Sequence, residues 1–307
     1  MGSEEVTSSD TSSADVAPDG DVIFLVGPEE HRLRVYSLIL KNASKVFSAM
    51  LGPHFSEGQT LLQPNTPVIS IPLPEDDFDS MVIICNILHG RNETFIEPLK
   101  PIQILNVAIA ADKWDCGVPL AWAIKDWMIS ERYTDVKELW RLMLAAYLFG
   151  EAAAFAKITK ALLFHHRGSY FELGEGNELE SSVQMRIRIL LEEARTKLRT
   201  DLLQAVFDAA YCAAGNCKCG WTGKCALSVL QAQKEALSPR RLMGKTVMEA
   251  IGIAEKLDVA TSGWPETSCQ LKLLHCTIDQ IKNLLRNLAS NLKERGGLTI
   301  ESVHSQA

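Results

Sequence analysis

Four cysteines lie close together in the chain, in the order Cys212-x4-Cys217-x-Cys219-x5-Cys225. Thiolates bind zinc well, and a bound Zn²⁺ would close a segment that has little apolar content of its own. Against this, the pattern contains no C-x2-C pair, and a C-x-C spacing is unusual for zinc. Cys212 also continues the apolar stripe of the helix expected before it, so buried or free thiols are the alternative. Additional sulfur and nitrogen donors follow at Cys269, His275 and Cys276. The sequence indicates no cofactor other than zinc.

A second candidate site is the segment Phe55-Ser56-Glu57, in the polar stretch between residues 52 and 66. An exposed aromatic side chain can fill a pocket on a partner protein, and a neighbouring carboxylate can fix the orientation. The alternative is that Phe55 packs back on the core and Glu57 is only solvated. Either way, the chemistry of this segment favours binding over catalysis.

The catalytic motifs that the sequence suggests are incomplete. Gly244-Lys245-Thr246 matches the end of a phosphate-binding loop, but Pro239 stands where that loop needs its first glycine. The chain contains no G-x-S-x-G and no H-E-x-x-H. His165-His166 lies in a polar stretch, where a solvated pair is the simpler interpretation, and no general base accompanies the cysteines. We therefore expect no enzymatic activity.

Composition indicates a globular protein of 307 residues, 47% hydrophobic and 22% charged, which is enough for one large domain or two ordinary ones. No apolar run approaches the roughly 18 residues of a membrane span, and no secretion signal begins the chain. We expect an intracellular protein, in the cytoplasm or nucleus, with reduced cysteines and no membrane contact. The net charge of the chain is −7, and residues 1–19 contribute −5 of it through five acids and no Lys or Arg. The remaining residues therefore carry a net charge of −2. A body this close to neutral is not expected to bind nucleic acid.

Hydrophobic periodicity predicts strands only in the first part of the chain. The run from Val22 to Val26 is continuously apolar, as in a strand covered on both faces. In the following segment Leu33 and Val35 alternate with arginines, as in a half-buried hairpin partner. Two short helices should follow, the second capped by Ser44, and a further strand at 68–71 should stop at Pro72.

The later elements are predicted to be helices. Asp77 caps the first of them, and Pro119 precedes one whose apolar stripe includes Leu120, Ile124 and Met128. The tryptophans mostly lie on apolar helix faces, so we expect them to pack in the core. We place a disordered acidic tail at 1–19, an α+β domain at 20–130 with its core at 20–95, an all-helical region at 131–295 and a flexible tail at 296–307.

The order of these elements resembles the BTB/POZ domain. The matching motifs are Asp21-Val22, Val35-x-Ser37-x-Ile39-Leu40, Ser44-x-x-Phe47-x-x-Met50-Leu51, Phe55-x-Glu57-Gly58, Ile69-x-Ile71 and Phe78-x-x-Met81. The resemblance is close over residues 20–95 and weaker to about residue 130. The helical half resembles the C-terminal extensions of many fungal-type BTB proteins. Tyr36 is a departure, because the family usually has a histidine there that contacts the strand aspartate, here Asp21. Residues 1–19 do not supply the extra helix and strand that many family members exchange between protomers.

The resemblance implies an α+β fold, a small sheet flanked by helices, and a role in protein–protein interaction. BTB substrate adaptors dock on a cullin ubiquitin ligase through a hydrophobic residue, any residue and an acid in the loop that corresponds to Phe55-Ser56-Glu57. We therefore expect a substrate adaptor whose helical half holds a client protein. The alternative is an oligomerisation or scaffold protein, for example in transcriptional regulation, that forms homo-oligomers and binds no cullin.

Overall fold

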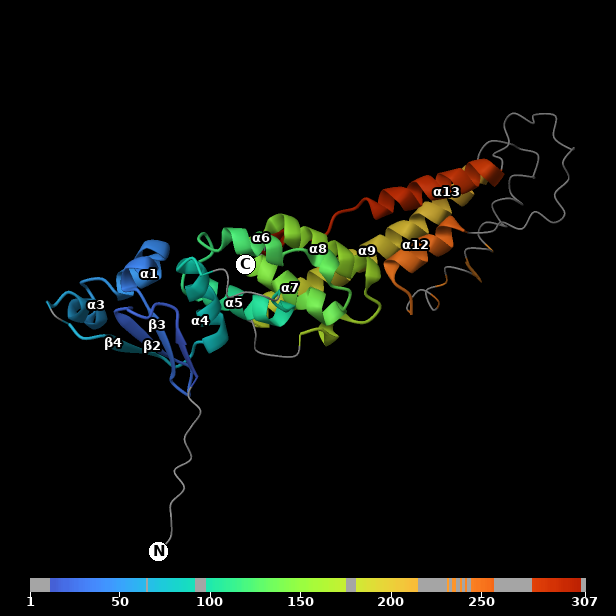
Figure 1. Ribbon diagram of the computed structural model, residues 1–307. Helices are drawn as coiled ribbons and strands as arrows, with labels where there is room; N and C mark the ends of the chain where they lie inside the picture. Colours follow the sequence, from blue (N-terminus) through green and yellow to red (C-terminus); the bar gives the residue numbers. More distant parts are fainter. Residues whose placement is uncertain are drawn as a thin grey trace, which may run out of the picture. The chain divides into compact units, whose positions relative to one another are not determined.

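The chain forms two compact units, Met1–Ala154 and Phe155–Ala307 (Figure 1). The computed structural model describes residues 12–64, 66–91, 98–174, 181–214, 231, 234–235, 238, 241, 244–256 and 278–304. The first unit combines a small four-stranded sheet with flanking helices, and the described part of the second is helical. The predicted α+β class is confirmed. Contacts alone do not define domains, so the predicted limit at residue 130 stays a prediction.

The sheet has the order β1-β3-β2-β4. At its centre β2 (Val22–Val26) pairs antiparallel with β3 (His31–Val35), with Phe24 opposite Leu33. Phe24, Leu33 and Val35 are completely buried. The prediction of a strand covered on both faces and of a half-buried partner is therefore confirmed.

The first strand, β1 (Ser13–Asp15), lies in the segment that the sequence predicted to be disordered. It pairs parallel with β3, and the carbonyl of Ser12 accepts a hydrogen bond of 3.1 Å from the amide of Arg32. Val16 and Ala17, which follow it, are buried. The prediction is thus wrong for residues 12–19, because backbone pairing and two small apolar side chains suffice to order a segment whose average composition is polar.

The fourth strand, β4 (Ile69–Leu73), continues through the proline that was expected to stop it. It pairs parallel with β2 and lies at the edge of the sheet. Proline lacks an N–H group, and an edge strand tolerates this because one side of its backbone needs no partner strand. The predicted stop at Pro72 is therefore wrong by the last two residues of the strand.

Short helices cover the sheet. They are α1 (Ser37–Ala43), α2 (Lys45–Met50), α3 (Ser56–Leu61) and α4 (Phe78–Leu88). Two of them, α2 and α4, begin at the predicted caps, whereas α3 lies in the polar stretch that the sequence predicted to be a loop. The Ser44 hydroxyl accepts the amide of Phe47 at 3.0 Å, and the Asp77 carboxylate accepts that of Ser80 at 2.9 Å. These bonds satisfy amides that would otherwise lack a partner in the first helical turn.

The rest of the first unit is helical. It contains α5 (Pro101–Lys113), α6 (Ala121–Trp127), the 3-10 turn η2 (Ser130–Arg132) and α7 (Val136–Leu148), with α7 packed on α5. Leu120, Ile124 and Met128 are buried as predicted. Trp122 departs from the expectation that tryptophans pack in the core, because it is 86% exposed.

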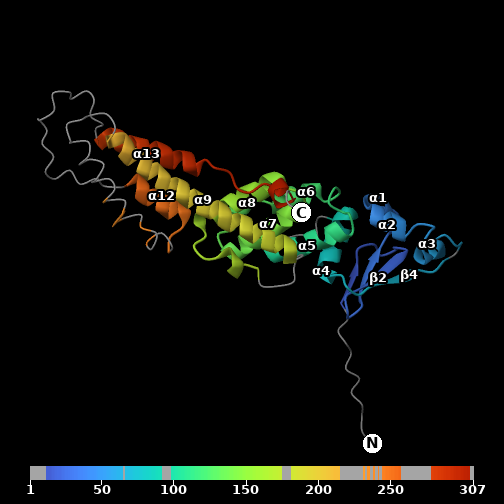
Figure 2. The same ribbon diagram turned by 180° about the vertical axis from the view of Figure 1, so that it is seen from behind.

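Three helices of the second unit lie side by side: α9 (Ser181–Ala214), α12 (Val247–Glu255) and α13 (Ile278–Lys293) (Figure 2). The remaining elements are α8 (Ala152–His165), which begins just before the unit boundary, the 3-10 turn η3 (Tyr170–Glu172) and α14 (Ile300–His304). No helix in the described ranges combines the length and the apolar character that crossing a membrane requires.

The C-terminal segment is ordered through residue 304, where the sequence predicted a flexible tail. The amide of Leu298 donates a hydrogen bond of 2.9 Å to the buried hydroxyl of Thr159 in α8. A Cβ atom on Gly297 would lie 2.0 Å from the carbonyl oxygen of Ala156, so only glycine allows this approach. Val303 is also buried. The prediction is wrong for residues 296–304 because these contacts come from residues far away in the sequence.

Candidate protein-interaction site

A close contact between two glycines fixes the loop that carries Phe55. A Cβ atom on Gly58 would lie 1.7 Å from the carbonyl oxygen of Gly52, so the first turn of α3 presses directly on the backbone after α2. The carbonyl of Gly52 also accepts the amide of Phe55 at 3.4 Å. Together these contacts hold Phe55 at the start of α3 and leave the loop little freedom to move it inward.

Phe55 and Glu57 are both accessible from solvent. Phe55 is 52% exposed and occupies the position before the first residue of α3, with an extended backbone. Glu57 lies in the first helical turn, is half-buried, and accepts a hydrogen bond of 2.9 Å from the hydroxyl of Ser56. A carboxylate in the first turn is stabilised by the helix dipole. An aromatic ring and a carboxylate are therefore presented two residues apart.

Other apolar side chains are exposed in the same part of the sequence. Leu38 of α1 is 65% exposed, and Leu62, just after α3, is 66% exposed. Val46 of α2 is less exposed, at 38%. Single exposed apolar residues are normal on a protein surface, but several on consecutive short helices are typical of an interaction surface.

Asp21 caps the start of α1. Its carboxylate accepts hydrogen bonds from the amide and the hydroxyl of Ser37, at 2.7 and 2.6 Å. The amide of Tyr36 instead donates to Nε2 of His89, at 3.1 Å. Since an amide can only donate, Nε2 is unprotonated and Nδ1 carries the proton toward the carbonyl of Cys85, 2.7 Å away.

His89 was not identified from the sequence. It lies just after α4, where a histidine can bond to the last carbonyls of a helix, but its partner Tyr36 is 53 residues away. Burial, opposed in part by the hydrogen bond to Cys85, lowers the pKa of His89 from 6.5. The folded protein therefore favours the neutral ring.

We expect the stability of the first unit to fall as the pH drops below 6.5. Above this value the His89 ring is neutral in both the folded and the unfolded state. Below it the unfolded chain binds a proton more readily than the folded chain, which lowers the free energy of unfolding. This loss is complete once the pH is below the lower pKa of the folded state. Thermal melts of the chain and of the His89→Gln variant, measured at several pH values, check this. His54→Gln, at an exposed position, is the control. An unchanged pH slope in His89→Gln would contradict the assignment.

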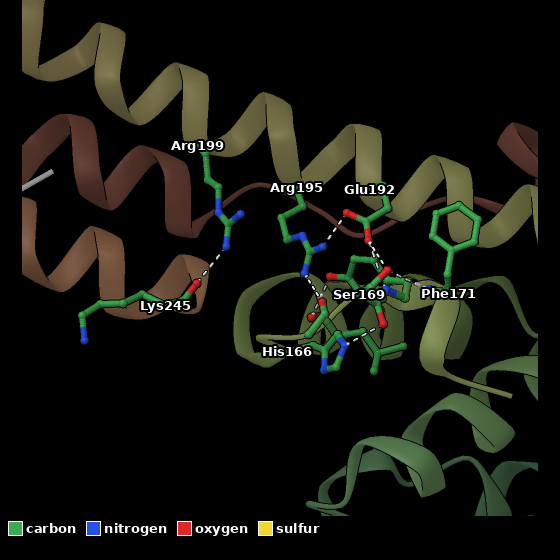
Figure 3. A network of polar contacts seen from close by, with 10 residues as sticks. His166, Ser169, Phe171, Glu192, Arg195, Arg199 and Lys245 are labelled. Carbon is green, nitrogen blue, oxygen red and sulfur yellow. Dashed lines mark hydrogen bonds and ion pairs between the residues drawn. The ribbon is translucent and has the colours of Figure 1, made fainter. Parts of the chain in front are cut away.

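A polar cluster in the second unit joins η3 to α9 (Figure 3). The Glu192 carboxylate accepts the amide of Tyr170 at 3.1 Å and forms an ion pair with Arg195. Arg195 also donates to the carbonyl of Gly168 at 2.5 Å and lies over the ring of Tyr170, 4.5 Å from its centroid. The donors and acceptors of Glu192 and Arg195 are thus directed at each other and at the backbone.

Two further members of this cluster have shifted pKa values. Burial is the main cause of the lowered pKa of Arg199, and the positive charge of Arg195 is the second cause. The guanidinium of Arg199 donates a hydrogen bond of 2.8 Å to the carbonyl of Lys245. Burial lowers the pKa of His166, which contacts the carbonyl of Ser169 at 3.4 Å. We interpret the cluster as structural, because its bonds to Tyr170, Gly168 and Lys245 fasten the segment at η3 and the start of α12 to α9.

The predicted zinc ligands cannot be compared with the structure. Cys217, Cys219 and Cys225 lie outside the described residues, and for Cys212 only the backbone in α9 is described. In the described ranges, no group of three or more His, Cys, Asp or Glu side chains could hold a metal ion. The zinc hypothesis stays a prediction, and metal analysis of protein purified without a chelator tests it.

Comparison of the chain with protein-family models, curated proteins and solved structures gives no significant match in any of the three.

Proposed function

We propose that the chain is a BTB/POZ protein that acts through protein–protein interaction and recruits a client to a cullin ubiquitin ligase. The observation that carries this proposal is the exposed Phe55, with Glu57 two residues later in the first turn of α3. Further support comes from the element order: a hairpin, two short helices, a third before β4, and then α4. Asp21 also caps α1, next to the position where the family uses a histidine. The proposal rests on these motifs and on no relative.

Loss of the aromatic anchor is expected to weaken cullin binding by about thirtyfold, which corresponds to about 2 kcal/mol. The ring would enter a pocket on the partner, and Phe55→Ala removes that contact. Glu57→Ala should have a smaller effect, because a carboxylate at the edge of an interface mainly fixes orientation. Binding of the purified chain to a purified cullin, measured by surface plasmon resonance, checks both values.

Phe171, in the short helical turn η3, provides a control of matched residue type and exposure, because it is also a phenylalanine and is 51% exposed. Phe171→Ala should bind the cullin like the parent chain. The proposed docking would be refuted if Phe55→Ala and Glu57→Ala also bound like the parent. Failure of the parent chain to bind any cullin would refute it as well.

A second candidate is an oligomerisation or scaffold protein that binds no cullin. The observation in its favour is the exposure of Tyr36, Leu38 and Val46 at and after the start of α1, since a second copy of the chain could cover these side chains. Analytical ultracentrifugation distinguishes the candidates: a stable homo-oligomer without cullin binding favours the scaffold.

A further inference from the structure

A pocket of about 390 Å³ opens in the first unit where α5 ends, α6 begins and α7 ends. Its lining includes the apolar side chains of Ala111, Ile124 and Phe149. Polar and apolar atoms contribute almost equally to the surface of this pocket. The volume is enough for a large apolar side chain and part of the chain that carries it.

Three carboxylates belong to the same lining, those of Asp112, Asp115 and Glu151. No basic residue lines the pocket. Within the described part of the chain, these three carboxylates form neither a hydrogen bond nor an ion pair through their side chains. Like charges gathered around an apolar surface repel each other, and an incoming cation would relieve that repulsion. We call this site the acidic pocket.

The apolar surface continues beyond the acidic pocket. Val118, which belongs to the lining, is 88% exposed, and Trp122, next to the lining residue Ala121, is 86% exposed. These are the two most exposed large apolar side chains in the described ranges. The ammonium group of Lys125 lies 5.2 Å from the centroid of the Trp122 ring, so a cation of the chain itself already covers one face of this ring. A ligand that covers both residues has to be longer than one that only fills the pocket.

We propose that the acidic pocket, with Val118 and Trp122, docks a basic segment of a partner protein. One apolar anchor of that segment enters the pocket, and Lys or Arg residues on either side of it face Asp112, Asp115 and Glu151. Charge complementarity selects a basic segment, and the apolar surface outside the pocket selects a peptide over a small cation. The site does not include Phe55 or Glu57, so it is independent of the proposed cullin contact.

Selection of short random peptides displayed on phage, against the full chain, tests the proposal. The selected peptides should be rich in Lys and Arg around a single Leu, Ile, Phe or Trp. Their affinity, measured by fluorescence anisotropy, should fall with added salt and should fall at least about tenfold in the triple variant Asp112→Asn, Asp115→Asn, Glu151→Gln. Trp122→Ala should cause a comparable loss.

The control variant Glu193→Gln, Glu294→Gln changes two exposed acids of the second unit and should keep the full affinity. Circular dichroism confirms that each variant is folded. The proposal is wrong if no peptide is selected, if the selected peptides are not basic, or if they bind the triple variant as well as the parent. It is also wrong if spermine, a small cation without an apolar anchor, competes for the site as well as the unlabelled peptide does.

Discussion

Replacement of Asp76 by alanine should lower the free energy of unfolding of the first unit by about 3 kcal/mol. The Asp76 carboxylate is buried and accepts the indole N–H of Trp114 at 2.9 Å, and Lys113 donates to its other oxygen at the same distance. Truncation leaves the indole N–H without its partner and opens a cavity. The side chain of Lys113 is 44% exposed, so its ammonium can turn to water and contributes less to the loss.

The effect should spread through the aromatic core. Trp114 stacks on Phe47 with ring centroids 4.5 Å apart and nearly parallel planes, and Phe47 lies 5.8 Å from Phe24 in the central strand. Asp76 thus anchors Trp114, the first of three neighbouring aromatic rings that connect the end of α5 to the sheet. Loosening this ring should expose amides of β2, which hydrogen exchange of the corresponding peptides would detect.

Two variants separate the contributions at Asp76. Asp76→Asn keeps an oxygen for the indole N–H but turns amide protons toward Lys113, so a loss between zero and the alanine value is expected. Glu75→Ala changes an exposed neighbouring acid and should leave the melting temperature within experimental error. Chemical denaturation of the purified variants measures all three. An Asp76→Ala protein as stable as Glu75→Ala would show that the buried contact is not stabilising.

Local patterns in the sequence predicted the elements of the first unit well. The alternation around Leu33 and Val35 depends only on which face of a strand is buried, and both residues are buried. The caps Ser44 and Asp77 act on amides three residues away, so their effect is visible in a short window. Patterns of this kind need no knowledge of the rest of the fold.

Contacts between distant residues could not be predicted in this way. Asp76 and Trp114 are 38 residues apart, and Thr159 and Leu298 are 139 residues apart. Neither pair has a characteristic spacing or motif. The ordering of residues 12–19 was missed for the same reason. It depends on pairing with β3, and nothing within residues 12–19 themselves indicates that partner.

The candidate site was partly visible in the sequence. Residue types alone identified Phe55 and Glu57, but left open whether the ring faces solvent or the core. The close contact between Gly58 and Gly52 limits how far the loop can move the Phe55 ring toward the core. In the sequence this contact is marked only by two glycines six residues apart. The acidic pocket was not predicted at all, because Glu151 follows α7 whereas Asp112 belongs to α5, so no window of sequence contains the group.

Loss of Glu192 by substitution with alanine is expected to lower the free energy of unfolding of the second unit by about 2 to 3 kcal/mol. Removal of one partner from a buried ion pair leaves the other charge without compensation, and the side chain of Arg195 is only 8% exposed. Glu192 itself is 27% exposed, so we place the loss at the lower end of the range for buried pairs. The amide of Tyr170 also loses its acceptor.

Hydrogen exchange should show where this loss acts. Glu192 and Arg195 hold the turn from Gly168 to Tyr170 on α9, so the corresponding peptide should lose protection before the rest of the unit. Glu192→Gln keeps an oxygen for the amide of Tyr170 and should lose less. Glu193→Ala, at an exposed position on the same helix, should change neither stability nor exchange.

A double variant tests whether the loss comes from the uncompensated charge. Arg195→Met removes the guanidinium but keeps an unbranched apolar side chain that can still cover the ring of Tyr170. If the isolated charge is the main cost, Glu192→Ala with Arg195→Met should be more stable than Glu192→Ala alone, since a buried pair is often replaced by apolar residues at little cost. Additive losses in this cycle would instead show that the two side chains act separately, and that the hydrogen bonds to η3 and Gly168, not their mutual attraction, stabilise the unit.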